Sequence, residues 1–189
     1  MEDFFKAKSL VELNPKDILL YGPSKLLVDE FLWHNPAVGI IASYTPKAKD
    51  VLDHFDVFRG VDQIESFAQA TVVSCATFNQ CEKENLTPLQ LKENYIPLFI
   101  SVGGVNFHHY LLEGETFICL GNIKFYKFRQ MVVDGRIYKA PKGLNLKDYF
   151  ENFKDEDLEN YNLDDSFELV ATCFDITGRA FKKDKSILK

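Results

Sequence analysis

The chain has 189 residues, of which 46% are hydrophobic and 26% are charged, and these proportions are typical of an ordinary globular protein. At roughly 150 residues per domain, this length predicts one domain spanning residues 1–189. The 22 basic and 28 acidic residues leave a net charge of −6, which argues against nucleic acid as a partner because neutralisation of phosphates dominates that binding.

Residues 1–6 lack the basic start and apolar stretch of a signal peptide. The longest apolar run, residues 96–105, is about half the roughly 20 residues that a membrane-spanning helix needs. The four cysteines have no CxxC or metal-ligand spacing, and they are Cys75, Cys81, Cys119 and Cys173. We therefore expect reduced thiols in a cytoplasmic protein, with no metal, no cofactor and no membrane span.

The first elements that the pattern predicts are a short helix and a hairpin. Ser9 could cap an N-terminal helix that Pro15 ends quickly. Residues 26–32 and 39–44 then read as two strands, and Asn35-Pro36 between them is a turn signal.

From Gly60 to about Cys81 the pattern changes to a helical one. Its apolar residues recur at spacings of three and four, and they are Val61, Ile64, Ala68, Val72, Cys75 and Ala76. Only a thin polar strip interrupts them, and a helix that is apolar around most of its circumference is a buried helix. We expect a sheet to wrap around it.

The remaining chain predicts one short helix and then strands. The helix covers residues 89–94, and strands follow at 98–102 and 116–129, with a bulge at Gly121. A turn at Asp134-Gly135 would close a further hairpin.

An acidic stretch, residues 141–166, precedes the closing strands at 167–172 and 178–182 and is interpreted as an insertion. It predicts a solvated face, and the alternative is that its aromatic residues cap a cavity or bind a partner. Strands that are segregated from one long buried helix indicate the α+β class, with an antiparallel sheet curved over the helix. This is the hotdog arrangement.

Glu65 is the most informative residue of the helix, because at 100° per residue it falls inside the apolar stripe. A carboxyl buried there would favour its protonated form, and such a group is a candidate general acid or base. The alternative is a structural glutamate bonded to backbone or to a neighbouring subunit.

His54 lies just before the helix, and Gly60 at the helix start would let a ligand approach the backbone. The free N–H groups of Gly60 and Val61 could bind an oxyanion. A base, a carboxyl and N–H donors near one helix start are the parts needed for elimination beside a thioester carbonyl. Alternatively, a lone histidine forms structural hydrogen bonds only.

These residues also carry a family resemblance. His54-Phe55, Gly60-Val61, Ile64-Glu65 and Ala68-Gln69-Ala70 resemble the signature of the FabZ/FabA-like 3-hydroxyacyl-acyl carrier protein dehydratases. Upstream, Leu26-Leu27-Val28-Asp29 is similar to the first long strand of that family. The resemblance spans roughly residues 18–130 and the closing strands.

The resemblance implies a hotdog homodimer, or a trimer of such dimers, that acts in fatty-acid or related acyl-chain biosynthesis. His54 would remove the C2 proton, Glu65 of the second subunit would protonate the leaving hydroxyl, and the N–H of Gly60 would hold the thioester oxygen. The substrate would be carried on acyl carrier protein. The acyl tunnel would be lined by Phe55, Phe58, Ile64 and Ala68.

Two alternatives remain at the level of sequence. A hotdog acyl thioesterase could use Glu65 to position water. A degenerate hotdog could bind acyl chains or serve a structural role, because the loop between His54 and Gly60 is shorter than in the family and contains no proline.

Overall fold

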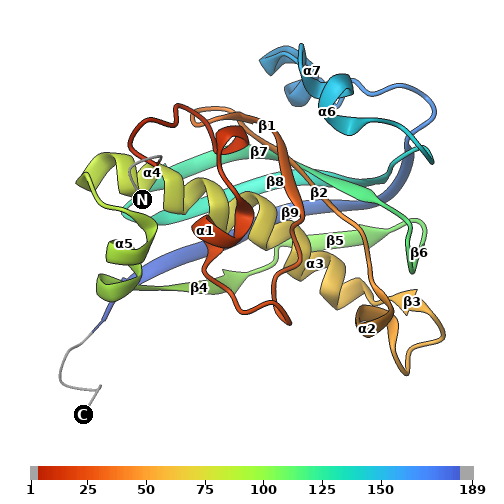
Figure 1. Cartoon of the computed structure of the whole chain (residues 1–189), viewed down its shortest axis with the longest axis horizontal. Helices are drawn as coiled ribbons and strands as arrows, with labels where there is room; N and C mark the ends of the chain where they lie inside the picture. Colours follow the sequence, from red (N-terminus) through yellow and green to blue (C-terminus); the bar gives the residue numbers. More distant parts are fainter. Residues whose placement is uncertain (1–3, 184–189) are drawn as a thin grey trace.

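The computed structural model describes residues 4–183, and its main element is a seven-stranded antiparallel sheet (Figure 1). The strands follow the order β1-β2-β7-β8-β9-β4. β5 also pairs with β9, at residues 171–174, whereas β4 pairs with residues 177–182 of the same strand. Their bounds are β1 Glu30–Asn35, β2 Gly39–Tyr44, β4 Tyr95–Ser101, β5 Gly104–Phe107, β7 Phe117–Lys127, β8 Gln130–Lys139 and β9 Glu168–Lys182. A second sheet pairs β3 (Val57–Phe58) with β6 (Leu111–Leu112).

One long helix crosses a face of the main sheet, two short helices pack beside its C-terminal half, and two others lie apart from it (Figure 1). The long helix consists of α3 (Gly60–Ala68), the π-helical segment η2 (Gln69–Val73) and α4 (Ser74–Glu84). The other helical elements are η1 (Leu10–Glu12), α1 (Pro15–Leu19), α2 (Ala48–Val51), α5 (Pro88–Asn94), α6 (Leu146–Phe150) and α7 (Asp155–Asn160). No helix of residues 4–183 is both long enough and apolar enough to cross a membrane.

The predicted architecture is confirmed, because a large antiparallel sheet covers one long helix. The strand at 39–44 and the helix near 89–94 form as predicted, and the first strand is displaced to Glu30–Asn35. At the N-terminus Ser9 does act as a cap, but the helix that it caps is the single turn η1. The two predicted closing strands are one continuous strand, β9.

Two predictions about β7 and β8 are wrong. The hairpin turn does not lie at Asp134-Gly135, since β8 runs through both residues, and the chain instead reverses at Phe128-Arg129, where both φ angles are positive. The register shift of β7 lies between Ile123 and Phe125, whereas Gly121 pairs regularly with its neighbours.

The glycines of these strands let the long helix approach the sheet closely. A Cβ added at Gly121 would lie 2.4 Å from Cγ2 of Thr71, and one at Gly135 would lie 2.6 Å from Cζ of Phe67. Real Cβ atoms do not come so close to other atoms, because packed interiors already sit at van der Waals contact. Gly135, which the sequence predicted as part of a hairpin turn, therefore allows the helix to pack closely on the sheet.

The long helix buries more of its polar side chains than the sequence predicted. Gln63, Ser66 and Gln69 are at most 2% exposed. Each finds a partner, because Gln63 and Ser66 donate to the carbonyls of Phe58 and Leu27, respectively. Buried polar groups are stable when they are hydrogen-bonded, so this face of α3 packs inward.

The acidic segment 141–166 lies on the opposite side of the sheet from the long helix (Figure 1). Its acidic residues face solvent, whereas Phe150 and Leu158 are at most 1% exposed and pack against Ile118 and Leu120 of β7. The predicted solvated face is present, and the segment in addition buries a second hydrophobic cluster against the sheet.

Candidate active site

His54 is held in a tight loop between α2 and β3. Its backbone N–H donates to Val51, and its carbonyl accepts from Val57. Three neighbours, Asp53, Phe55 and Asp56, have φ angles between 55° and 59°, a left-handed conformation that is costly for residues with a Cβ.

The imidazole of His54 has a defined tautomer. Its Nδ1 lies 3.0 Å from the carbonyl oxygen of Val57, and a carbonyl can only accept, so Nδ1 carries the proton. In the neutral ring Nε2 is then the unprotonated nitrogen, and it has no hydrogen-bond partner within residues 4–183. A histidine in this state can act as a general base through Nε2.

The start of α3 offers free backbone donors beside this loop. The N–H groups of Gly60 and Val61 donate no hydrogen bond within the described part of the chain, and Arg59 provides no side-chain cap. The ring of Phe107 lies over Gly60, since an added Cβ would be 2.8 Å from its Cζ. Only glycine fits beneath this ring, and the two donors lie at the positive end of a helix, where an oxyanion would be stabilised.

Glu65 lies just over one turn along α3 and faces solvent. Its Oε1 accepts a 2.8 Å hydrogen bond from Nε2 of Gln69. Gln69 is itself anchored, because it donates to the carbonyl of Lys25 and accepts from the N–H of Leu27. The carboxyl is thus positioned by a buried amide that is tied to the N-terminal segment.

The expectation that Glu65 is buried within its own chain is wrong. The stripe that contains Val61, Ile64 and Glu65 is turned away from the sheet, and Val61 is 63% exposed. The physical reason is the way α3 is anchored, because Gln63 and Ser66 donate to backbone carbonyls inside the protein. Val61 and Glu65 are thereby left on the outer side, whereas the later stripe residue Ala68 is buried.

Gln69 is a site residue that the sequence reasoning did not single out. The available signal was its position, since residues four apart share one helix face and a glutamine can reach a carboxylate at that spacing. The π-helical segment that begins at Gln69 was also missed. Such segments are frequent at functional sites.

The four residues expected to line an acyl tunnel lie in different surroundings. Phe58 and Ala68 belong to the main core and are 1% and 3% exposed, Ile64 is half-buried, and Phe55 is 93% exposed. Within one chain, no hydrogen bond joins His54 to Glu65 among the described residues. The single chain therefore positions each group without bringing the two into contact.

The main sheet also has an apolar edge, and its residue Phe107 lies over Gly60 at the start of α3. β4 and β5 form this edge, because their only strand partner in the described structure is β9. Its exposed apolar side chains are each 40–50% exposed, and they are Ile96, Leu98, Phe99, Ile100, Val102 and Phe107. Natural proteins seldom leave such an edge open, because its free backbone groups pair readily with another chain.

Within residues 4–183, no three His, Cys, Asp or Glu side chains are grouped as a metal-binding set. All four cysteines are free and buried. Burial raises the pKa of Cys81 and of Cys173 to about 12, so neither is a reactive thiolate.

No protein-family model matches the chain. No curated protein matches it either. Among solved structures, the chain is similar to one in the dehydratase heterocomplex ApeI:P from Xenorhabdus doucetiae, with 11% identity, a TM-score of 0.63, and coverage of 93% of this chain and 95% of that one.

Further likenesses have TM-scores below 0.5. They include the Escherichia coli PaaI protein of the phenylacetic acid degradation operon (11% identity, TM-score 0.47, 79% and 80% covered). Another is Slr0204, a 1,4-dihydroxy-2-naphthoyl-CoA thioesterase from Synechocystis (9% identity, TM-score 0.48, 78% and 85% covered). At such identities a likeness shows the fold alone, and that fold is the hotdog fold.

Proposed function

We propose that the protein is a dehydratase that removes water from a 3-hydroxyacyl thioester and leaves a 2-enoyl thioester. The observation that carries this proposal is that His54, with Nε2 free, lies in the loop that leads through β3 to the free N–H groups of Gly60 and Val61 at the start of α3. This arrangement suits abstraction of a proton next to a carbonyl, because the base and the oxyanion donors lie on adjoining segments.

In the proposed reaction, Nε2 of His54 removes the proton from C2 of the acyl chain. The electron pair of that C–H bond forms the C2–C3 double bond as the C3–O bond breaks, and the departing oxygen takes a proton from Glu65. The thioester oxygen is held by the N–H of Gly60 while negative charge develops on it.

Glu65 would be supplied by a second copy of the chain. The uncovered apolar stripe of α3 and the open edge β4–β5 together make a surface that a second copy can cover. Covering would remove Glu65 from water and favour its protonated form. We propose a homodimer with two shared sites, in which each catalytic histidine faces the partner's glutamate.

The test is turnover of a 3-hydroxyacyl-carrier-protein substrate, followed by enoyl absorbance. His54→Ala and Glu65→Gln should each abolish turnover in a folded protein. Mixing the two inactive variants, with subunit exchange, should restore about a quarter of wild-type activity, because mixed dimers contain one intact site. Full activity of either single variant would sink the proposal, and failure of the mixture would place both residues in one subunit's site.

A second candidate function rests on the bond between Gln69 and Glu65. An amide N–H that donates to Oε1 orients the carboxyl group, which could position water for hydrolysis of an acyl thioester. Release of free acid without enoyl product would identify this thioesterase activity. A folded dimer that gives neither product, with either carrier protein or coenzyme A as the thiol, would leave a degenerate hotdog without enzymatic activity.

A further inference from the structure

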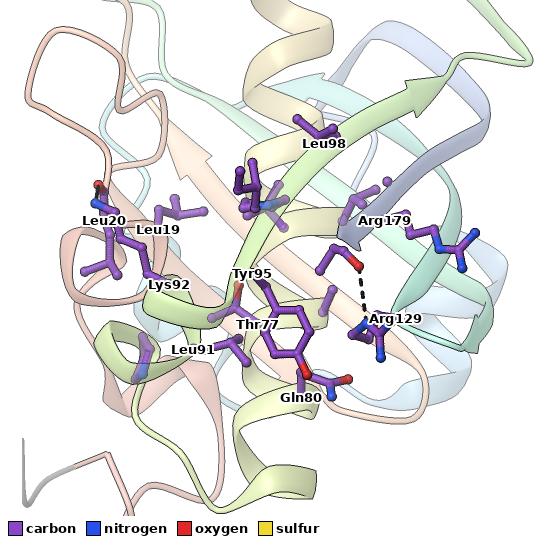
Figure 2. Close-up of a pocket in the computed structure, with 18 of the residues that line it drawn as sticks. Leu19, Leu20, Thr77, Gln80, Leu91, Lys92, Tyr95, Leu98, Arg129 and Arg179 are labelled. Atoms are coloured by element: carbon purple, nitrogen blue, oxygen red, sulfur yellow. Dashed lines mark hydrogen bonds between the residues drawn. The ribbon is translucent and has the colours of Figure 1, made fainter. Parts of the chain in front are cut away.

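A cavity lies at the other end of the long helix from His54 (Figure 2). It measures about 300 Å³ and is bounded by α1, α4, α5, β4 and the end of β9. Along a helix that rises 1.5 Å per residue, Ala76 in its wall is about 24 Å from Gly60. His54, Gly60, Val61, Glu65 and Gln69 do not line it, although Ile96 and Leu98 of the open edge do.

The wall of this cavity is apolar. Much of it is formed by aliphatic side chains, among them Ile18, Leu19, Val72, Val73, Ala76 and Leu98. The polar groups of the wall are largely satisfied without a ligand, because Tyr126 donates to Oε1 of Gln80 and Gln80 donates to Glu84. A ligand in this cavity would therefore make mainly apolar contacts and few hydrogen bonds.

Cationic side chains lie at the same cavity. Figure 2 shows Lys92 on one side of Tyr95, with Arg129 and Arg179 on the other. Arg129 is fixed by a 3.3 Å hydrogen bond from Nε to the carbonyl of Ala180 and by stacking over the ring of Tyr95. Arg179 faces away from α4, because its neighbour Gly178 is the residue of β9 that faces Val72 and because its guanidinium lies over the ring of Phe181. Arg129 forms no salt bridge among residues 4–183, although the carboxylate of Glu84 lies nearby and accepts from the hydroxyl of Tyr95.

An apolar cavity with a guanidinium group beside it matches one ligand class. We propose that the cavity binds a straight-chain fatty carboxylate, with its hydrocarbon tail along α4 and its carboxylate on Arg129. Arginine suits this role because its planar group binds a carboxylate through two parallel hydrogen bonds. The site goes beyond the proposed function, since it uses neither His54 nor Glu65.

Binding of the hydrocarbon tail in the cavity is tested by calorimetric titration of the full chain with dodecanoate. One molecule of dodecanoate should bind per chain. Ala76→Phe places a ring in the cavity and should weaken binding at least tenfold. Lys83→Phe adds the same ring on the exposed side of α4 and should leave the affinity unchanged. Equal affinities of the two variants would overturn the proposal.

The head group is tested with the arginines. Arg129→Met should weaken dodecanoate binding about tenfold or more, because a hydrogen bond to a charged group is lost, whereas Arg179→Met, on the other face of the strand, should leave the affinity unchanged. Dodecanol should bind wild type and Arg129→Met equally, and Arg129→Lys should retain part of the dodecanoate affinity. If Arg129→Met binds dodecanoate as wild type does, the carboxylate is not recognised there.

The two sites are separated by variants of the candidate active site. His54→Ala and Glu65→Gln should bind dodecanoate with wild-type affinity, whatever their effect on turnover. Loss of binding in either variant would show that the fatty acid occupies the active site and would overturn a separate cavity site. A dodecanoyl thioester of coenzyme A, which lacks the free carboxylate, should compete at least tenfold more weakly than dodecanoate.

Discussion

The two faces of the sheet are covered in different ways. On one face the long helix is anchored by its own polar side chains, since Ser66 and Gln69 reach backbone groups of residues 25–27. On the other face the segment 141–166 contributes mainly aromatic packing, and the polar anchors come from the sheet, where Trp33 and Asn122 donate to its carbonyls.

The long helix therefore holds the candidate site in a fixed position, whereas the segment 141–166 mainly shields the other face of the sheet from water. A directional hydrogen bond to a buried partner fixes both the rotation and the position of a helix. The free N–H groups at the start of α3 and the carboxyl of Glu65 are therefore presented by a rigid element. The segment 141–166 carries no residue of the candidate site, and its contribution is the apolar area that it buries.

The largest effect is expected on the helix side, at Phe67. Its side chain is fully buried and lies in the gap left by Gly135. Phe67→Ala should lower the free energy of unfolding by about 3–5 kcal/mol, which is the usual cost of an aromatic cavity. Urea denaturation measures it, and Phe55→Ala, at a position that is 93% exposed, is the matched control with an expected change below about 0.5 kcal/mol.

A smaller effect on the same side depends on pH. The ring of His34 is buried against Phe78, and its Nδ1 accepts from the N–H of Leu10. Burial lowers the pKa of His34 from 6.5 to about 4, so the unfolded chain binds a proton between these values and the folded chain does not. The contribution of the neutral His34 ring to the free energy of unfolding is fully present above pH 6.5, and it is expected to fall by about 2–3 kcal/mol as the pH approaches 4.

His34→Gln should remove this part of the pH dependence, because glutamine does not titrate and its Oε1 can still accept a hydrogen bond. The comparison is made by urea denaturation of both proteins at pH 7 and at pH 4.5. If the stability gap between wild type and variant is the same at both pH values, the ring is not kept neutral by burial.

On the other face, the expected test residue is Phe150, which is 1% exposed and packs against Tyr149, Phe153 and Phe167. Phe150→Ala should cost only about 2 kcal/mol, because a segment built from two short helices can open locally before the whole domain unfolds. Hydrogen exchange should then accelerate in residues 146–160 and stay slow in α4. A loss as large as that of Phe67→Ala would mean that both faces unfold as one unit.

The layered fold could be predicted from sequence because hydrophobic period and strand segregation are strong signals. The orientation of α3 could not, because Val61 and Glu65 point away from the sheet. The polar residues Gln63 and Ser66 are instead buried beside Phe67. Hydrogen bonds from Ser66 and Gln69 to a segment about 40 residues earlier reverse the expected polarity, and no local pattern encodes such partners. His54, Gly60 and Glu65 were found by their order in the chain, whereas the supporting Gln69 was not.

The smallest expected effect is a coupling at the contact between the long helix and the sheet, where Gly121 of β7 lies against Thr71. Gly121→Ala places a methyl group 2.4 Å from Cγ2 of Thr71, so the helix must shift, at an expected cost of about 1–3 kcal/mol. Thr71→Ser removes that Cγ2 and keeps the hydroxyl that donates to the carbonyl of Phe67. In the double variant the cost of alanine should fall by at least about 0.5 kcal/mol, a coupling that a double-mutant cycle measures. Strict additivity would mean that the strand, and not the helix, yields at this contact, and the helix would then be the more rigid of the two layers.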